Sequence, residues 1–102
     1  MIARSTLAAF WTEQPDAEQP LKAWHEEASA ANWRGPQDVK ATYGRASVLK
    51  HGRVVFDIKG NDYRLVVYIH YRSRTVFIKF VGTHEDYDDI DAQTVGGTGK
   101  AG

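Results

Sequence analysis

The feature that most constrains the fold of this chain is a change of hydrophobic period near residue 46. Before that point apolar residues recur every three or four positions, as in helices that cover a core with one face. After it, short segments rich in β-branched and aromatic residues alternate with turns, which is typical of strands. Helices followed by a meander of strands indicate the α+β class. At 102 residues the chain has room for one domain with one modest core.

Two helices are predicted in the N-terminal part. The first is expected from an N-cap at Ser5 to about Glu13, and the second spans about residues 17–31. Residues 37–43 are expected to add one or two helical turns, and residues 1–4 a short strand. Tryptophans at such spacings are usually core residues, so their rings are expected to pack against the sheet. The three tryptophans are Trp11, Trp24 and Trp33.

The second part of the chain predicts a twisted, mainly antiparallel sheet of about four to five strands. Its strands are expected at residues 48–49, 54–58, 63–71 and 75–81, joined by short turns that suit hairpins. Strict alternation puts Leu65 on the core face and both Arg64 and Tyr68 on the open face. In the last strand the same rule predicts that Lys79 shares a face with Phe77 and Val81.

The formal net charge is zero, but the charge is unevenly distributed. Residues 40–79 carry nine basic and two acidic side chains, a balance of +7, and the rest of the chain carries four basic and eleven acidic ones, a balance of −7. Such a basic half can bind a polyanion, although the same charges also serve as solvated strand faces that discourage edge pairing.

The chain has no cysteine and no apolar run long enough for a membrane span, so a cytoplasmic protein without a membrane partner is expected. Residues 93–102 are interpreted as a flexible tail after the domain of residues 1–92.

The side chains that suggest chemistry lie near one end of the predicted sheet. Arg64 stands at the start of one strand, and His84 and Tyr87 follow the last strand. Arginine can bind two phosphate oxygens at once, and histidine can exchange a proton near neutral pH. If Thr83 caps a short helical turn, His84 and Tyr87 share a face of it. These are the groups that a metal-free ribonuclease needs to hold a phosphate and move a proton.

No cofactor is predicted. The acidic run that follows His84 lacks the glycine-turn spacing of a calcium loop, and acids at the start of a helix are explained by the helix dipole. We therefore predict no metal site. The sequence also lacks a phosphate-binding glycine loop, a zinc-type histidine pair and a serine nucleophile motif.

Two motifs carry a family resemblance. The segments Gly60-Asn61-Asp62-Tyr63-Arg64-Leu65 and Gly82-Thr83-His84-Glu85-Asp86-Tyr87-Asp88 resemble those of the HigB-type toxins of the RelE/ParE superfamily. The resemblance covers roughly residues 2–92 and includes both N-terminal helices. It implies the toxin of a type II toxin–antitoxin pair, an endoribonuclease (mRNA interferase) that cuts mRNA in the ribosomal A site and thereby inhibits translation. It also implies a helix-turn-helix antitoxin of the HigA type, with operator DNA bound only through the complex.

The resemblance also implies roles for individual residues. Arg64 would stabilise the scissile phosphate, with Lys79 as a weaker match, while His84 and Tyr87 would take acid–base and base-stacking or proton-transfer roles. Many RelE-type members carry lysines on the strand before the arginine strand, where this chain has Val55 and Asp57. The missing positive charge would have to come from Arg53, Lys59 or Lys79. The residues predicted to contact RNA are Arg53, Lys59 and Tyr68.

Two other interpretations remain open at this level. The first is a non-catalytic module that blocks translation or another machine by occupancy, because the same superfamily includes proteins that poison gyrase. The second is a structural protein whose strand charges serve only solubility. The first predicts intact transcripts in cells, whereas a nuclease creates new RNA ends. The second predicts no growth arrest when the protein is expressed without a partner.

Overall fold

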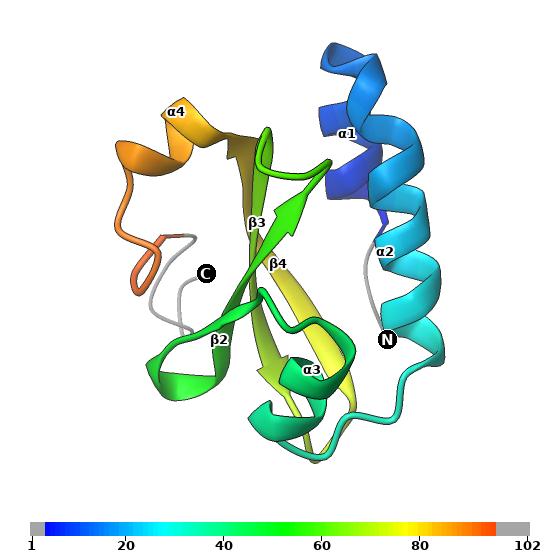
Figure 1. Ribbon diagram of the computed structural model, residues 1–102, viewed down its shortest axis with the longest axis vertical. Coiled ribbons are helices and arrows are strands. Elements are labelled where there is room, and N and C mark those ends of the chain that lie inside the picture. Colours follow the sequence, from blue (N-terminus) through cyan, green and yellow to red (C-terminus); the bar gives the residue numbers. More distant parts are fainter. Residues whose placement is uncertain (1–3, 96–102) are drawn as a thin grey trace.

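The helices lie where the change of period predicts them (Figure 1). In the computed structural model, which describes residues 4–95, α1 spans Ser5–Glu13 and α2 spans Glu18–Ala30, with a 3₁₀ turn, η1 (Pro15–Ala17), between them. Ser5 was predicted to be the N-cap of α1 but is its first helical residue. The N-cap is Arg4. The third helix, α3 (Pro36–Thr42), begins with a proline, whose missing N–H costs nothing at a first helical position.

The strands form one antiparallel sheet in the order β1-β2-β3-β4. Their bounds are Ser47–Val48 for β1, Arg53–Ile58 for β2, Tyr63–His70 for β3 and Thr75–Thr83 for β4. A 3₁₀ turn, η2 (Lys50–Gly52), joins β1 to β2, and a short helix, α4 (His84–Asp88), follows β4. The predicted α+β class, with helices packed on a mainly antiparallel sheet, is therefore confirmed.

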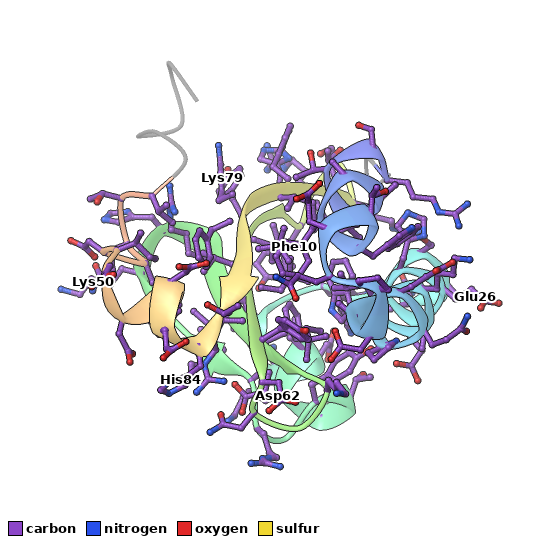
Figure 2. All side chains as sticks on the ribbon, turned by 90° about the horizontal axis from the view of Figure 1, so that it is seen from above. Phe10, Glu26, Lys50, Asp62, Lys79 and His84 are labelled. Atoms are coloured by element: carbon purple, nitrogen blue, oxygen red, sulfur yellow. The ribbon has the colours of Figure 1, made fainter. Side chains whose placement is uncertain are left out.

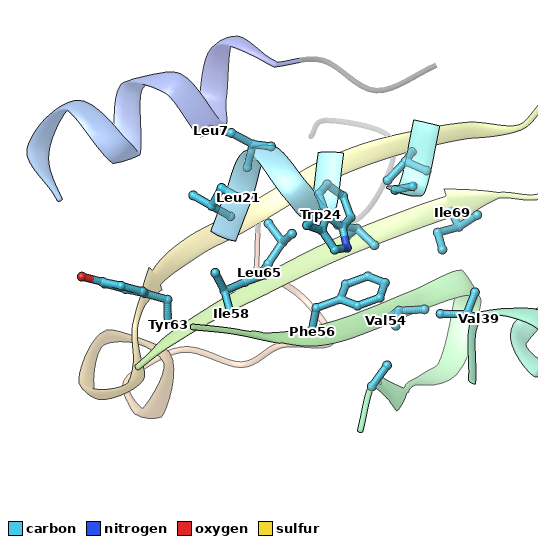
Figure 3. Close-up of a cluster of buried hydrophobic side chains, with 14 of the residues drawn as sticks. Leu7, Leu21, Trp24, Val39, Val54, Phe56, Ile58, Tyr63, Leu65 and Ile69 are labelled. Atoms are coloured by element: carbon cyan, nitrogen blue, oxygen red, sulfur yellow. The ribbon is translucent and has the colours of Figure 1, made fainter. Parts of the chain in front are cut away.

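The core lies between one face of this sheet and the helices α1 and α2 (Figure 3). Leu7 and Leu21 from the helices and Phe56 and Leu65 from the strands are at most 1% exposed. Burial of each such side chain contributes about 1.5–3 kcal/mol, so this cluster holds the sheet at a fixed position under the helices. Two of the three tryptophans are buried as predicted, and the third is partly buried against the cluster. They are Trp24, Trp33 and Trp11 respectively.

The sequence predicts that the opposite face of the sheet is open. In the structure, part of that face is covered. The helix α4 and residues 89–95 lie on that side, away from α1 and α2 (Figures 1 and 2). Val66 follows Arg64 by two residues in β3 and so shares its face of the sheet. It is fully buried, although it lies outside the core cluster. Arg53 is only 5% exposed, and its Nη1 donates to the carbonyl oxygens of Ala92 at 3.1 Å and Val95 at 2.7 Å. This part of the prediction was wrong because the chain folds back after α4.

A β-bulge changes the alternation in β4. Val66 pairs with Phe80 and Val67 with Ile78, so Lys79 is an extra residue without a partner in β3. One extra residue reverses the order of inward and outward side chains beyond it. Val81 therefore packs against the core, and Gly82 pairs with Arg64. The predicted common face of Phe77, Lys79 and Val81 is wrong for this reason.

The predicted N-terminal strand and most of the predicted tail lie outside the described residues. Of the proposed tail, residues 93–95 are described, and backbone hydrogen bonds join Thr94 and Val95 to Asp91. In the described part of the chain, no helix has the length and apolar character needed to cross a membrane.

Candidate active site

The site is built on three neighbouring strands at the end of the sheet where β2 turns into β3. The register puts Asp57 of β2 and Gly82 of β4 on either side of Arg64 of β3. The Arg64 side chain is 14% exposed, so its charge is partly removed from water. A cation in such a position attracts an anion more strongly than one on a solvated loop.

The guanidinium of Arg64 is held from several directions. Its Nη1 lies 3.2 Å from Oδ1 of Asp57 and 3.4 Å from the carbonyl oxygen of Asn61. Its Cζ lies 5.6 Å from the centre of the Tyr87 ring, within the range of a cation–π contact. Both polar contacts use Nη1, so within residues 4–95 the Nη2 and Nε donors have no hydrogen-bond partner, and these two donors form the pair that a bidentate contact with phosphate would use.

The helix α4 begins directly after β4, and its start is fixed by two hydrogen bonds. The Thr83 hydroxyl accepts from the Asp86 N–H at 3.1 Å, which confirms the predicted N-cap. The backbone N–H of His84 donates to the carbonyl oxygen of Asp62 at 3.0 Å and ties this helix to the β2–β3 turn. Figure 2 shows His84 and Asp62 on the same side of the molecule. His84 and Tyr87, three residues apart, are neighbours on the surface of α4.

The two α4 side chains have different surroundings. The imidazole of His84 is 45% exposed, and its Nδ1 lies 3.5 Å from Oδ2 of Asp88. When Nδ1 carries its hydrogen toward that carboxylate, Nε2 is the nitrogen presented to a substrate. The Tyr87 ring lies between the Arg64 guanidinium and the Phe80 ring, whose centre is 6.5 Å away.

Gly82 allows α4 to approach the sheet. A Cβ at this position would lie 2.6 Å from Cζ of Phe80 and 3.3 Å from Cβ of Asp86. A larger residue would have to displace the Phe80 ring, whose centre lies 6.5 Å from that of the Tyr87 ring. A glycine is needed opposite Arg64 because backbone and side chains come this close.

A cavity of about 310 Å³ borders the site on the β2 side. It opens where β1 ends, because β1 pairs only with Val54 and Val55 and leaves the next residues of β2 without a strand neighbour on that edge. Asp57 lines this cavity, together with Arg45 and Gly60. Sequence reasoning considered Asp57 only as a missing lysine. Its position opposite Arg64 in a hairpin centred on the Gly60 turn was the signal that could have identified it.

With this geometry established, the chain can be compared with known proteins. Residues 17–90 match the model of a family described as HigB toxin, the RelE-like toxic component of a toxin–antitoxin system. The chain belongs to the HigB toxin family. It is 24% identical over 94 residues to the mRNA interferase toxin HigB of Escherichia coli K12, which covers 90% of each chain. The mRNA interferase HigB proteins of Escherichia coli O157:H7 and Shigella flexneri match with the same identity and coverage. A toxic component of such a system has an antitoxin as its partner.

Lys59 of this toxin is not aimed at the site. Its ammonium lies 2.9 Å from Asp16 and 3.5 Å from Asp62, so two carboxylates already balance its charge. Asp16 also accepts a hydrogen bond from the Tyr63 hydroxyl, and this bond and Lys59 hold the pKa of Asp16 below its usual value. These contacts fasten η1 to the β2–β3 turn, and this indicates a structural role for Lys59.

Three other predicted residues of the toxin lie away from Arg64. Arg53 is buried under the chain end, as described above. Tyr68 stacks on Phe77, with ring centres 5.7 Å apart, and Nζ of Lys79 lies 5.9 Å from the centre of the Phe77 ring. Phe77 is 45% exposed, an unusual position for a phenylalanine that sequence reasoning did not single out. Figure 2 shows Lys79 well separated from His84.

The acidic run after β4 does not converge on one point. Within residues 4–95, no three or more histidine, aspartate and glutamate side chains are grouped as metal ligands would be. Asp88 pairs with His84, while the backbone N–H of Asp86 completes the cap of α4.

Proposed function

We propose that this HigB-family toxin is an endoribonuclease that cuts mRNA, on the ribosome, without a metal ion. The observation that carries the proposal is the position of the Arg64 guanidinium beside Tyr87, one helical turn from His84. A mostly buried, oriented cation next to a proton-transfer group is suited to phosphate chemistry. The names of the E. coli and Shigella relatives as mRNA interferases support the same class of reaction.

The reaction is an attack by an RNA 2′-oxygen on the neighbouring phosphorus. A bond forms between the 2′-oxygen and phosphorus, and the bond to the 5′-oxygen of the next nucleotide breaks, which gives a 2′,3′-cyclic phosphate and a 5′-hydroxyl. Arg64 binds the phosphate oxygens as their negative charge increases. His84 gives a proton to the departing 5′-oxygen, and Tyr87 stacks on a base or assists this proton transfer.

We propose that RNA beyond the cut phosphate lies on the surface formed by Tyr68, Phe77 and Lys79. Tyr68 is four residues from Arg64 on the same strand, a distance of about 13 Å along β3. An exposed aromatic ring with a cation beside it is typical of single-strand binding, because bases stack and phosphates attract the cation. The Lys79–Phe77 contact is worth about 0.5–1 kcal/mol, less than the ~1–3 kcal/mol of a stacked base, so a base can displace it.

Phe77→Ala is expected to weaken binding of a fluorescent single-stranded RNA about fivefold in a His84→Ala background, because about 1 kcal/mol of stacking is lost. Lys79→Gln is expected to reduce the slope of log affinity against log salt by about 0.7, the value for one phosphate contact to a single strand. Fluorescence anisotropy at several salt concentrations measures both. Val48→Ala, at another exposed apolar residue, is the control. Loss of antitoxin binding with unchanged RNA affinity would identify a protein interface instead.

The nuclease proposal is tested by mapping RNA 5′ ends in cells that express the toxin without its antitoxin. The parent toxin is expected to create new 5′ ends within coding regions, and His84→Ala is expected to reduce their number at least tenfold while it still binds the antitoxin. His70→Ala, at an exposed histidine that contacts Ser73, is the matched control. Growth arrest with intact transcripts would contradict the nuclease and favour a toxin that blocks by occupancy.

The antitoxin is proposed to be a small helix-turn-helix protein that binds operator DNA in complex with the toxin. The expected observation is a reading frame for such a protein next to the toxin gene. DNA binding by the isolated toxin would contradict this division of roles, and a mobility-shift assay with each protein alone measures it.

A further inference from the structure

The reaction proposed above requires a base as well as an acid. The entering 2′-oxygen and the leaving 5′-oxygen lie on opposite sides of the phosphorus in an in-line attack. The base and the acid must therefore lie on opposite sides of the group that binds the phosphate. His84 follows β4 directly, so it enters the site from the β4 side of Arg64.

Asp57 lies on the other side of Arg64. Neighbouring strands are about 4.8 Å apart, so β2 and β4 approach a phosphate on Arg64 from opposite directions. The Asp57 side chain is 23% exposed, which leaves it accessible to substrate. Its Oδ1 is occupied by Arg64 at 3.2 Å, and its Oδ2 is available to accept a second hydrogen bond.

We propose that Asp57 is the general base of this toxin, which takes the proton of the attacking 2′-hydroxyl. The proposal rests on the proposed nuclease function and names the residue that this function still lacks. In this step the 2′-hydroxyl proton moves to the Asp57 carboxylate while the 2′-oxygen bonds to phosphorus. His84 delivers its proton to the 5′-oxygen, and water later restores both protonation states.

The cavity next to Asp57 has the position that the attacking nucleoside requires. Its volume of about 310 Å³ is at the lower end of small-molecule sites and suits one nucleoside. It lies on the β2 edge, so a ribose there presents its 2′-hydroxyl to Asp57 and its 3′-phosphate to Arg64. Arg45, an exposed cation in its lining, can balance the next phosphate toward the 5′ end.

The other groups near the site are less suitable as a base. Hydrogen bonding to Asp16 raises the pKa of Lys59, which keeps this amine protonated. Asp88 is paired with His84 on the β4 side, where the acid is needed. Asp62 is mostly exposed and paired with Lys59. Among these described residues, Asp57 is the carboxylate that adjoins Arg64 from the β2 side.

The first test compares Asp57→Asn with Asp62→Asn, two changes in one hairpin that each remove a charge. Asparagine keeps the oxygen that accepts from Arg64 but cannot take the 2′-hydroxyl proton. We expect Asp57→Asn to slow single-turnover cleavage of ribosome-bound mRNA about 10²-fold with unchanged RNA occupancy, within the range for a lost general base. Asp62→Asn is expected to stay within about twofold of the parent, as a surface change with no proton-transfer role. Cleavage by Asp57→Asn within threefold of the parent overturns the proposal.

The second test separates a base from a positioning residue. In an RNA with sulfur in place of the 5′-oxygen at the cut site, the leaving thiolate needs no proton. His84→Ala should then regain most of its rate, whereas Asp57→Asn should remain about 10²-fold slow. Rescue of Asp57→Asn by sulfur overturns its assignment as the base.

If Asp57→Asn unfolds, Asp57→Glu and Asp57→Gln serve instead, and equal rates for these two overturn the proposal. If the parent toxin cuts neither the ordinary RNA nor the sulfur-substituted RNA, the nuclease proposal itself is refuted. Failure of the nuclease proposal is thereby distinguished from failure of the Asp57 proposal.

Discussion

Arg64→Ala is expected to lower the rate of mRNA cleavage by about 10²–10³-fold and to abolish growth arrest, the effect seen when one oxyanion donor is removed from an enzyme. The guanidinium is 14% exposed, and the backbone of β3 positions it between two paired strands. In the proposed mechanism its charge therefore acts on the phosphate from a fixed and partly desolvated position. Single-turnover cleavage of ribosome-bound mRNA measures the rate, and a growth assay measures the toxicity.

Arg34→Ala removes the same charge from the loop between α2 and α3 and is the matched control, with an expected rate near that of the parent. Arg64→Lys is expected to restore little activity, because a lysine lacks the planar fork that contacts two phosphate oxygens and the face that lies on Tyr87. A rate loss below tenfold for Arg64→Ala would exclude this residue from the catalytic centre. Unchanged antitoxin affinity shows that the variant is folded.

The local features of the fold could be predicted because each depends on residues close in sequence. The helical stripes identified α1 and α2, and Thr83 followed by acids identified the cap of α4. The alternation in β3 correctly separated Leu65 from Arg64. Two strands joined by a short turn have a fixed register, so the position of Arg64 near the end of the sheet followed from the turn.

The features that were missed depend on contacts between distant residues or on one extra residue. The bulge at Lys79 leaves no mark in a pattern of period two, yet it decides which side chains of β4 face the core. The pair of Asp57 and Arg64 is different, because it joins two strands of one hairpin and the hairpin register could have identified it. The buried position of Arg53 depends on residues 92 and 95, which carry no strong pattern of their own.

Other contacts explain how this small sheet presents the proposed site. The β2–β3 turn is fastened to η1 by Lys59 and Asp16, and the start of α4 is fastened to that turn through Asp62. The elements that carry Asp57, Arg64 and His84 are therefore linked by side-chain and backbone bonds other than those of the proposed reacting groups. Such links hold catalytic groups at a fixed geometry, which matters because small displacements cost large factors in rate.

Arg53→Ala is expected to destabilise the toxin by about 3 kcal/mol, because it removes two charge-assisted hydrogen bonds worth about 1.5–3 kcal/mol each. For a domain of this size the melting temperature should fall by about 12–24 °C. The chain end beyond α4 would lose its attachment to β2, so activity should fall through displacement of α4. Thermal unfolding followed by circular dichroism measures the first effect, and single-turnover cleavage well below the melting temperature measures the second.

This prediction distinguishes the two roles considered for Arg53. If Arg53 binds RNA, Arg53→Ala should lower RNA affinity and its salt dependence while the melting temperature stays near that of the parent. If it holds the chain end, the melting temperature falls and the salt dependence of RNA binding is unchanged. Arg72→Ala, which removes an exposed arginine from the turn after β3, is the control for loss of charge alone. The 5% exposure of Arg53 favours the second result, because a guanidinium sealed between β2 and residues 92–95 cannot reach a phosphate unless that segment opens.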